Sequence, residues 1–112
     1  PNRLTAHFME MVELSYREHA SVGHYARKIG VSEDHLSKVC KRQYQIGAKE
    51  IIQKRRIREA KTLLLESSYS SKEIAYLVGY EDANYFSRDF KRLTSVTPTE
   101  FRQTSANRRQ IC

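Results

Sequence analysis

The chain has 112 residues, which is enough for one domain with a modest hydrophobic core. Its 20 Lys and Arg residues outnumber 13 Asp and Glu residues, which gives a formal net charge of +7 at neutral pH. No apolar run approaches the roughly 20 residues that span a bilayer, and the N-terminus lacks a signal-like segment, so the sequence argues against a membrane-spanning protein and favours a cytoplasmic one.

The first predicted element is an amphipathic helix over residues 4–17. Leu4, Phe8, Met11 and Val12 recur there at helical spacing. We expect this helix to cover one flank of the helices that follow it.

A first pair of short helices is predicted over residues 21–43. Ser21 can cap the first of these helices, and Gly30 suits the left-handed position that ends it. Ser32 can cap the second helix, which should cover residues 33–43. The inner face of this second helix is expected to consist of Leu36, Val39 and Cys40.

A long middle helix is predicted over residues 48–66, because this segment has helical apolar spacing and no Gly or Pro in its interior. A continuous helix would act as a stiff strut rather than as a flexible linker. Its apolar residues are expected to pack against both pairs of short helices. They are Ile51, Ile52, Ile57, Ala60, Leu63 and Leu64.

A second pair of short helices is predicted over residues 70–93. Ser70 and Glu73 match the capping box that starts many helices. The second helix of this pair should cover residues 83–93. Its inner face is expected to consist of Phe86, Phe90 and Leu93, and Tyr85 is also expected to point inward.

The chain is expected to end in a short helix and a tail. Thr97 as a cap, Pro98 at the first helical position and Glu100 at the third form a strong start signal for a helix over residues 98–103. Residues 104–112 lack periodicity, which predicts a flexible tail.

The two pairs of short helices are copies of one pattern. SVGHYARKIG at residues 21–30 aligns with SSKEIAYLVG at residues 70–79, and residues 36–42 align with residues 86–92 after one extra residue in the second turn. Each copy has a capped short helix, a glycine, a brief turn and a second helix with a basic outer face. This order is typical of a helix-turn-helix DNA reader.

The second helix of each copy carries a polar and basic stripe on its outer face. Such a stripe suits the major groove, because short groups can approach base edges and long basic groups can reach phosphates. One stripe alone would more often be a solvated helix face, but two equivalent stripes favour DNA reading. They consist of Asp34, Ser37, Lys38 and Lys41 in the first copy and of Asn84, Ser87, Arg88 and Lys91 in the second.

The two stripes differ in chemistry. Arg88 can donate two hydrogen bonds to guanine, Asn84 can pair with adenine, and Lys38 can contact guanine less rigidly. Asp34 has three open interpretations: it accepts from a cytosine amino group, it orients Lys38, or it favours the helix start. Because the stripes are unlike, one chain is expected to recognise an asymmetric site.

Residues near the ends of the helices are candidates for phosphate contacts. Ser21 and Ser70 stand at helix N-termini whose free N–H groups could hold a phosphate, although capping alone would explain both. Basic residues late on the second helices are expected to contact the DNA backbone. These residues are Lys41, Arg42, Lys91 and Arg92.

The excess positive charge lies in one segment. Between Lys38 and Arg58 the sequence has eight basic residues against Glu50 alone, a local charge of +7, and the rest of the chain is balanced. Such a stripe attracts polyanions, with nucleic acid as the first candidate and an anionic membrane surface as the second. Arg55 and Arg58 are expected to extend this basic surface, whereas Arg56 is open between the surface and a structural ion pair.

Neither the cysteines nor the histidines match a metal site or an active site. Cys40 and Cys112 lack metal-ligand or disulfide spacing, so Cys40 is expected to be a buried core residue, with a redox switch as the less favoured alternative. The chain has no Gly-rich phosphate loop or nucleophile motif, so we expect no enzyme, cofactor or metal. Four histidines are expected to be surface or packing residues: His7, His19, His24 and His35.

The segment EIAYLVGYEDANYFSRDFKRLTSVTPTEFR, residues 73–102, closely resembles the C-terminal signature of AraC/XylS-type transcriptional regulators. The resemblance covers about residues 5–103. It implies an all-α domain of about seven helices within residues 1–103, in which two helix-turn-helix units joined by a long helix enter successive major-groove segments. By this resemblance the base-facing positions are Asp34, Ser37, Lys38, Ala83, Asn84, Ser87 and Arg88.

The sequence departs from the family pattern at structural positions. Cys40 replaces the usual aromatic residue, Gln45 and Ser95 stand where glycine is common, and Gly47–Ala48 replace a Ser-Pro-like start of the middle helix. These departures concern local packing and helix ends more than function.

The expected function is therefore sequence-specific binding of double-stranded DNA in a bacterial transcription regulator. RNA polymerase is a further candidate partner. Because the chain begins at Pro1, we expect an effector or dimerisation domain upstream. A helical RNA-binding or protein-binding module is the alternative, although no aromatic stacking platform for RNA is evident in the sequence.

Overall fold

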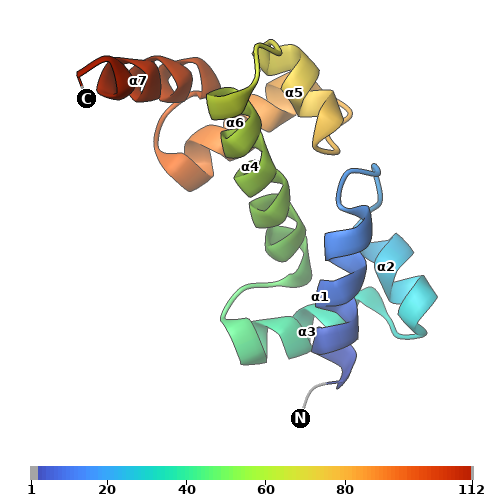
Figure 1. The fold of residues 1–112 in the computed structure, drawn as a ribbon. Coiled ribbons are helices and arrows are strands. Elements are labelled where there is room, and N and C mark those ends of the chain that lie inside the picture. The colour runs from blue at the N-terminus through green and yellow to red at the C-terminus, as the bar shows by residue number, and fades with distance from the viewer. Residues whose placement is uncertain (1–2, 112) are drawn as a thin grey trace. The chain divides into compact units, whose positions relative to one another are not determined.

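The computed structural model describes the backbone of residues 3–111 and the side chains of residues 3–106; over these residues it contains seven α-helices and no strand (Figure 1). The all-α prediction is confirmed. No helix in this range is both long and apolar enough to cross a membrane. The helices are α1 (Arg3–Ser15), α2 (Val22–Ile29), α3 (Glu33–Tyr44), α4 (Ala48–Glu66), α5 (Ser71–Leu77), α6 (Ala83–Thr94) and α7 (Pro98–Ile111).

The chain divides into two compact units, residues 1–55 and residues 56–112. The first contains α1, α2, α3 and the start of α4, and the second contains the rest of α4 with α5, α6 and α7. The helix α4 contributes to both cores, as predicted. Ala48, Ile51 and Ile52 belong to the first core, and Ile57, Ala60 and Leu64 belong to the second.

The core of the first unit is built around two aromatic rings. Phe8 of α1 and Tyr25 of α2 are fully buried and meet edge to face, with ring centroids 5.6 Å apart. A hydrogen bond of 3.1 Å joins the Tyr25 hydroxyl and Ser15 Oγ. Leu36 and Cys40 complete the buried face of α3, so the core position predicted for Cys40 is confirmed. Burial raises the pKa of the Cys40 thiol, which keeps it protonated at neutral pH.

The core of the second unit is a row of aromatic residues. Phe86 and Phe90 of α6 are fully buried, as predicted, and their ring centroids lie 5.8 Å apart. Phe90 also meets Phe101 of α7 edge to face at 5.6 Å. Leu93 is half-buried at the edge of this core. Val39 of α3 is also half-buried, and it lines a surface hollow.

The predicted helix starts are confirmed. Ser21 and Ser32 accept hydrogen bonds from the backbone N–H of the third residue beyond each of them. Ser70 and Glu73 form both hydrogen bonds of a capping box, and Thr97 and Glu100 form the same pair. The sequence analysis did not identify the cap of α6, which is Asp82.

Two helices end in a strained backbone conformation. Gln45 after α3 and Ser95 after α6 adopt the left-handed conformation, with φ of 66° and 74°. Gly30 after α2 adopts it as predicted, with φ of 94°. A side chain in this conformation costs about 1–2 kcal/mol, which glycine avoids.

Two predictions about the second unit are wrong. The final helix does not end near residue 103 but continues to Ile111, because residues 99–111 contain no Gly or Pro and include several strong helix formers. Arg102 anchors this helix through hydrogen bonds to the carbonyl oxygens of Leu64 and Ser67. Tyr85 does not point into the core, since 42% of it is exposed.

The other cysteine, Cys112, lies outside the described residues.

Candidate nucleic-acid interface

Each unit holds one of the two repeats as a pair of consecutive helices. In the first unit α2 leads through a turn at Gly30 into α3, and in the second unit α5 leads through a turn at Gly79 into α6 (Figure 1). The inner faces of α3 and α6 are fixed by the buried residues of each core. The remaining faces of these two helices are therefore the candidate interfaces, and each is described within its own unit.

On α3 the predicted outer face is open to solvent. Asp34, Lys38 and Lys41 are exposed, and Ser37 is half-buried. Lys38 Nζ lies 3.0 Å from Asp34 Oδ2, so of the three interpretations of Asp34 the structure shows the ion pair with Lys38. Both side chains are more than two-thirds exposed, at 69% and 77%. An exposed pair of this kind contributes only about 0.3–0.5 kcal/mol, so a nucleic acid could open it at little cost.

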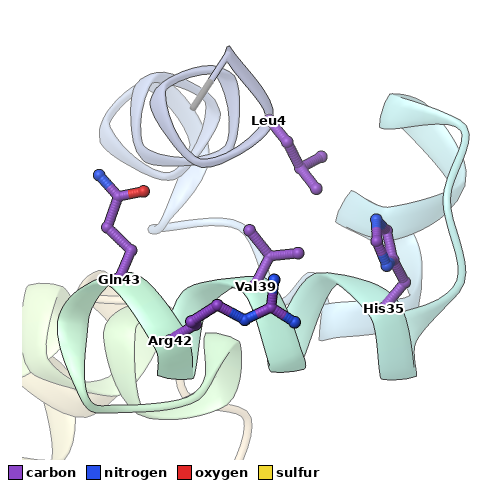
Figure 2. Close-up of a pocket in the computed structure, with 5 residues that line it drawn as sticks. All are labelled: Leu4, His35, Val39, Arg42 and Gln43. Carbon is purple, nitrogen blue, oxygen red and sulfur yellow. The ribbon is translucent and has the colours of Figure 1, made fainter. Parts of the chain in front are cut away.

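Two surface hollows adjoin this face. One is lined by Ser37, Lys38, Lys41, Arg42 and Gly47. The other lies between α1 and α3 and is drawn in Figure 2.

Figure 2 shows Leu4 of α1 across from Val39 and His35 of α3, with Arg42 and Gln43 one turn further along α3. Arg42 thus lines both hollows. Among the described residues it makes no ion pair. Its guanidinium is therefore available to an external anion.

On α6 the predicted outer face is also open. Asn84, Arg88 and Lys91 are exposed, whereas Ala83 and Ser87 are half-buried. The side chain of Asp82 accepts hydrogen bonds from the first turn of this helix, so its carboxylate is engaged by the backbone. The guanidinium carbon of Arg88 lies 6.0 Å from the centroid of the Tyr85 ring, at the edge of cation–π range.

A buried carboxylate lies behind this face. Asp89 of α6 is only 7% exposed and accepts a hydrogen bond of 2.8 Å from the hydroxyl of Tyr80. Arg92 Nη2 lies 3.8 Å from the other carboxylate oxygen of Asp89. The two arginines proposed for phosphate contacts therefore differ, because Arg92 lies beside a buried carboxylate of its own helix and Arg42 does not.

The alignment of the two repeats contains a signal for this pair that the sequence analysis missed. Val31 and Val39 of the first repeat correspond to Tyr80 and Asp89 of the second. A charged residue at a position that is apolar in the other copy indicates a specific buried contact, because an unpaired carboxylate is costly to bury.

The serines proposed for phosphate binding are occupied by their own helices. Ser21 Oγ accepts from the N–H of His24 at 3.3 Å. Ser70 Oγ accepts from the N–H of Glu73 at 3.1 Å, and the Glu73 carboxylate accepts from the N–H of Ser70 at 2.8 Å. Capping accounts for both serines, and the Glu73 carboxylate adds negative charge beside Ser70.

Part of the basic segment is structural, so the prediction for Arg55 is wrong. Its Nε and Nη2 donate to the two carboxylate oxygens of Glu13 at 2.8 and 2.9 Å, and its guanidinium lies 4.1 Å from the centroid of Tyr16. The guanidinium of Arg56 lies 5.6 Å from the centroid of Tyr80. Arg58 is exposed, as expected. The charge that this segment offers to a partner is therefore smaller than the sequence total.

The described residues contain no group of three or more His, Cys, Asp or Glu side chains that could hold a metal ion. The outer faces of α3 and α6 offer cations, an amide and hydroxyls, and the exposed Asp34 carboxylate on α3 is paired with Lys38. Cations, amides and hydroxyls bind phosphates and base edges.

Comparison with known proteins agrees with this geometry. A family model described as "Helix-turn-helix domain" matches residues 25–104. The chain is 33% identical over 107 residues to an uncharacterised HTH-type transcriptional regulator of Pseudoalteromonas carrageenovora, which covers 92% of this chain and 61% of that protein. It is 38% identical over 82 residues to the HTH-type transcriptional regulator GlxA of Rhizobium meliloti, which covers 73% of this chain and 25% of that protein. The chain thus spans about three-fifths of the first relative and a quarter of the second.

Solved structures share the arrangement of helices. The C-terminal domain of the two-component response regulator yesN from Fusobacterium nucleatum superposes with a TM-score of 0.84 and 29% identity, over 90% of this chain and 99% of that one. The DNA-binding domain of AdpA, solved with a target DNA, gives a TM-score of 0.86 over 94% of this chain and 95% of that one; at 20% identity this shows a shared fold. Because the helix-turn-helix model matches most of the chain, the protein belongs to the AraC-type helix-turn-helix family of transcriptional regulators.

Proposed function

We propose that this domain binds double-stranded DNA with sequence specificity, and that α3 and α6 each enter a segment of the major groove. The observation that carries the proposal is the repetition of one open, polar and basic helix face on two capped helix-turn-helix pairs. Relatives named as HTH-type transcriptional regulators, and a DNA-bound domain of the same fold, support it.

The base-facing residues of the two helices are proposed to read unlike half-sites. On α6, Arg88 would donate two hydrogen bonds to guanine and Asn84 would pair with adenine. On α3, Lys38 would contact guanine once it leaves Asp34. The side chains on the two helix faces differ in length and in their hydrogen-bond donors and acceptors, so the preferred DNA site is asymmetric. Half-buried residues would approach the groove with their short side chains: Ser37, Ala83 and Ser87.

The phosphate contacts are proposed to contribute unequally to DNA affinity. Lys41, Arg42 and Lys91 are exposed late on α3 and α6, where a basic side chain reaches the DNA backbone. Arg92 would make a weaker contribution, because it already lies near Asp89. Ser21 and Ser70 would act mainly as helix caps, and a phosphate there would be bound by whichever N–H groups the caps leave open.

Selection of bound duplexes from a random pool tests this function directly. We expect a motif with two unlike halves about 10 base pairs apart. A palindrome, or enrichment in one half only, would contradict the two-reader arrangement. A titration with the selected duplex, a scrambled duplex and a single-stranded RNA of the same length then separates the alternatives, since equal affinity for the RNA would favour an RNA-binding module.

The complete protein is proposed to contain more than this domain. The relatives are longer than the region they share with this chain. We propose that an effector or dimerisation domain lies in the remaining sequence and that the bound regulator contacts RNA polymerase. Copurification of the full-length protein with RNA polymerase on a promoter fragment, with Arg88→Ala as the control that weakens DNA binding, tests the second point.

A further inference from the structure

A buried hydrogen bond ties the turn before α6 to α6 itself. Tyr80, in the turn, and Asp89, on the helix, are 4% and 7% exposed, and the tyrosine hydroxyl donates to the carboxylate at 2.8 Å. Burial, followed by the hydrogen bond to Asp89, raises the pKa of Tyr80 far above its usual value, so the hydroxyl remains a donor at any physiological pH. The hydrogen bond restricts the ring of Tyr80 to one position.

The Tyr80 ring in turn leads to the outer face of α6. It lies 6.2 Å from the ring of Tyr85, and the Tyr85 ring lies 6.0 Å from the guanidinium carbon of Arg88. The guanidinium carbon of Arg56 also lies 5.6 Å from the centroid of the Tyr80 ring. Aromatic pairs and cations at these separations attract one another. Tyr80 therefore reaches α6 through its hydroxyl and, separately, through a tilted ring contact with Tyr85, whose ring lies next to Arg88.

The first repeat lacks this arrangement. Val31 occupies the place of Tyr80, since the N–H of each bonds to the carbonyl oxygen of the alanine five residues earlier. Val39 occupies the place of Asp89, and it lines the open hollow between α1 and α3 (Figure 2). Lys38, the counterpart of Arg88, forms an ion pair with the exposed carboxylate of Asp34. Only the second repeat therefore has a tyrosine and aspartate behind its base-facing cation.

We propose that Tyr80 is a positioning residue for Arg88, held in place by Asp89, and that it concentrates base discrimination in the second recognition helix. An arginine that makes two fixed hydrogen bonds to guanine loses side-chain freedom, and a ring contact that restricts it beforehand reduces this loss. The inference rests on the proposed function, in which Arg88 reads a base pair.

The test is Tyr80→Phe, which removes the hydroxyl and keeps the ring. The measured quantity is a selectivity ratio: the Kd for a duplex altered at the base pair where Arg88→Ala relaxes selectivity, divided by the Kd for the preferred duplex. We expect Tyr80→Phe to lower this ratio by about three- to tenfold, the effect of losing one buried hydrogen bond in a network. The ratio at the base pair read by Lys38 should not change. Asp89→Asn, which keeps an oxygen acceptor for Tyr80, should preserve most of the ratio.

Tyr25→Phe is the matched control, because it removes the buried hydroxyl that bonds to Ser15 in the first unit. Each variant is measured well below its melting temperature, so loss of stability alone cannot change the ratio. An unchanged ratio in Tyr80→Phe, or an equal fall in Tyr25→Phe, would overturn the inference alone. A wild-type chain that binds every duplex equally would overturn the proposed function as well.

Discussion

Single side chains on the two recognition helices have different surroundings although their backbones follow one pattern. Lys38 lies in solvent with an exposed ion-pair partner. Arg88 lies beside the ring of Tyr85, which the sequence analysis had placed in the core. An arginine is better suited to a directional contact than a lysine, since its planar group presents its donors in a rigid fork.

Replacement of Arg88 by alanine is expected to cost about 1–3 kcal/mol of binding free energy at one base pair and to relax selectivity there. The reason is that the two hydrogen bonds to guanine would be lost while the backbone contacts remain. Competition titrations against duplexes altered one base pair at a time measure the loss of binding free energy at each position. An equal loss on every duplex would show that Arg88 contacts phosphate.

The backbone at the C-terminal ends of α3 and α6 is strained, and a glycine there would relieve the strain. Gln45 and Ser95 follow α3 and α6 in the left-handed conformation. Both side chains are exposed, so no packing compensates for the strain at either position. The helices are nevertheless formed, because their buried faces stabilise them more than the two ends destabilise them.

Gln45→Gly is expected to raise the free energy of unfolding by about 0.5–1 kcal/mol, since relief of strain exceeds the added entropy of the unfolded chain. Urea unfolding of wild type and variant measures the change. Gln103→Gly is the control, because Gln103 is exposed within α7 and glycine there should destabilise by about 1 kcal/mol. A destabilised Gln45→Gly would show that strain at this position is negligible.

The two capping boxes make the second unit sensitive to acid. Backbone hydrogen bonds from Ser70 and Thr97 lower the pKa values of Glu73 and Glu100 below their usual 4.5. A carboxylate with a lowered pKa in the folded state stabilises fully above its unfolded pKa, and this contribution disappears as the pH falls through the folded value. The contribution is therefore fully present at neutral pH, begins to decrease near pH 4.5 and is lost once the pH has fallen below the lowered folded pKa values.

The double variant Glu73→Gln/Glu100→Gln should be less stable than wild type near neutral pH, and the difference should narrow as the pH falls toward 3. Glutamine can still accept the capping hydrogen bond but has no charge to titrate. Urea unfolding at several pH values measures the difference. A gap that stays constant across this range would mean that the caps act without their charge.

At the scale of the whole molecule, the excess positive charge lies in one segment that contributes residues to both units. The charge excess between Lys38 and Arg58 is divided by tertiary contacts into a part that faces solvent and a part that stabilises the fold. Lys41 belongs to the first part, and Arg55, with 16% of its side chain exposed, belongs to the second. Only the solvent-facing part can release counterions from DNA.

Lys41→Ala is therefore expected to weaken binding to all duplexes alike and to lower the slope of log K against log salt by about one unit. Arg55→Ala removes the same charge but should leave the slope unchanged and cost about 1–2 kcal/mol of stability, through loss of Glu13 and Tyr16 contacts. Salt titrations of both variants measure the slopes. Equal slopes for Lys41→Ala and wild type would remove Lys41 from the phosphate contacts.

The sequence by itself determined where the helices begin, most of their caps and the repeated helix-turn-helix, because these depend on residues three to five positions apart; the cap of α6 and the end of α7 were not predicted. Ser70 with Glu73 and Gly30 after α2 are examples, and each lies where its local pattern predicts. The candidate stripes on α3 and α6 follow from the same spacing. Their base and phosphate contacts stay predictions, since contact with DNA is a property of a complex.

Only the tertiary structure decided which charged and aromatic side chains are exposed to a partner and which are engaged in contacts within the fold. Arg55 meets Glu13 across 42 positions of the chain, and Arg102 meets Leu64 across 38. The hydrogen bond of Tyr80 to Asp89 likewise joins a turn to a helix face. Such contacts depend on how helices pack, and helical spacing within one element carries no information about its neighbour. The sequence therefore predicted two helix-turn-helix pairs with unlike polar stripes, and packing decided which neighbouring side chains each second helix contacts.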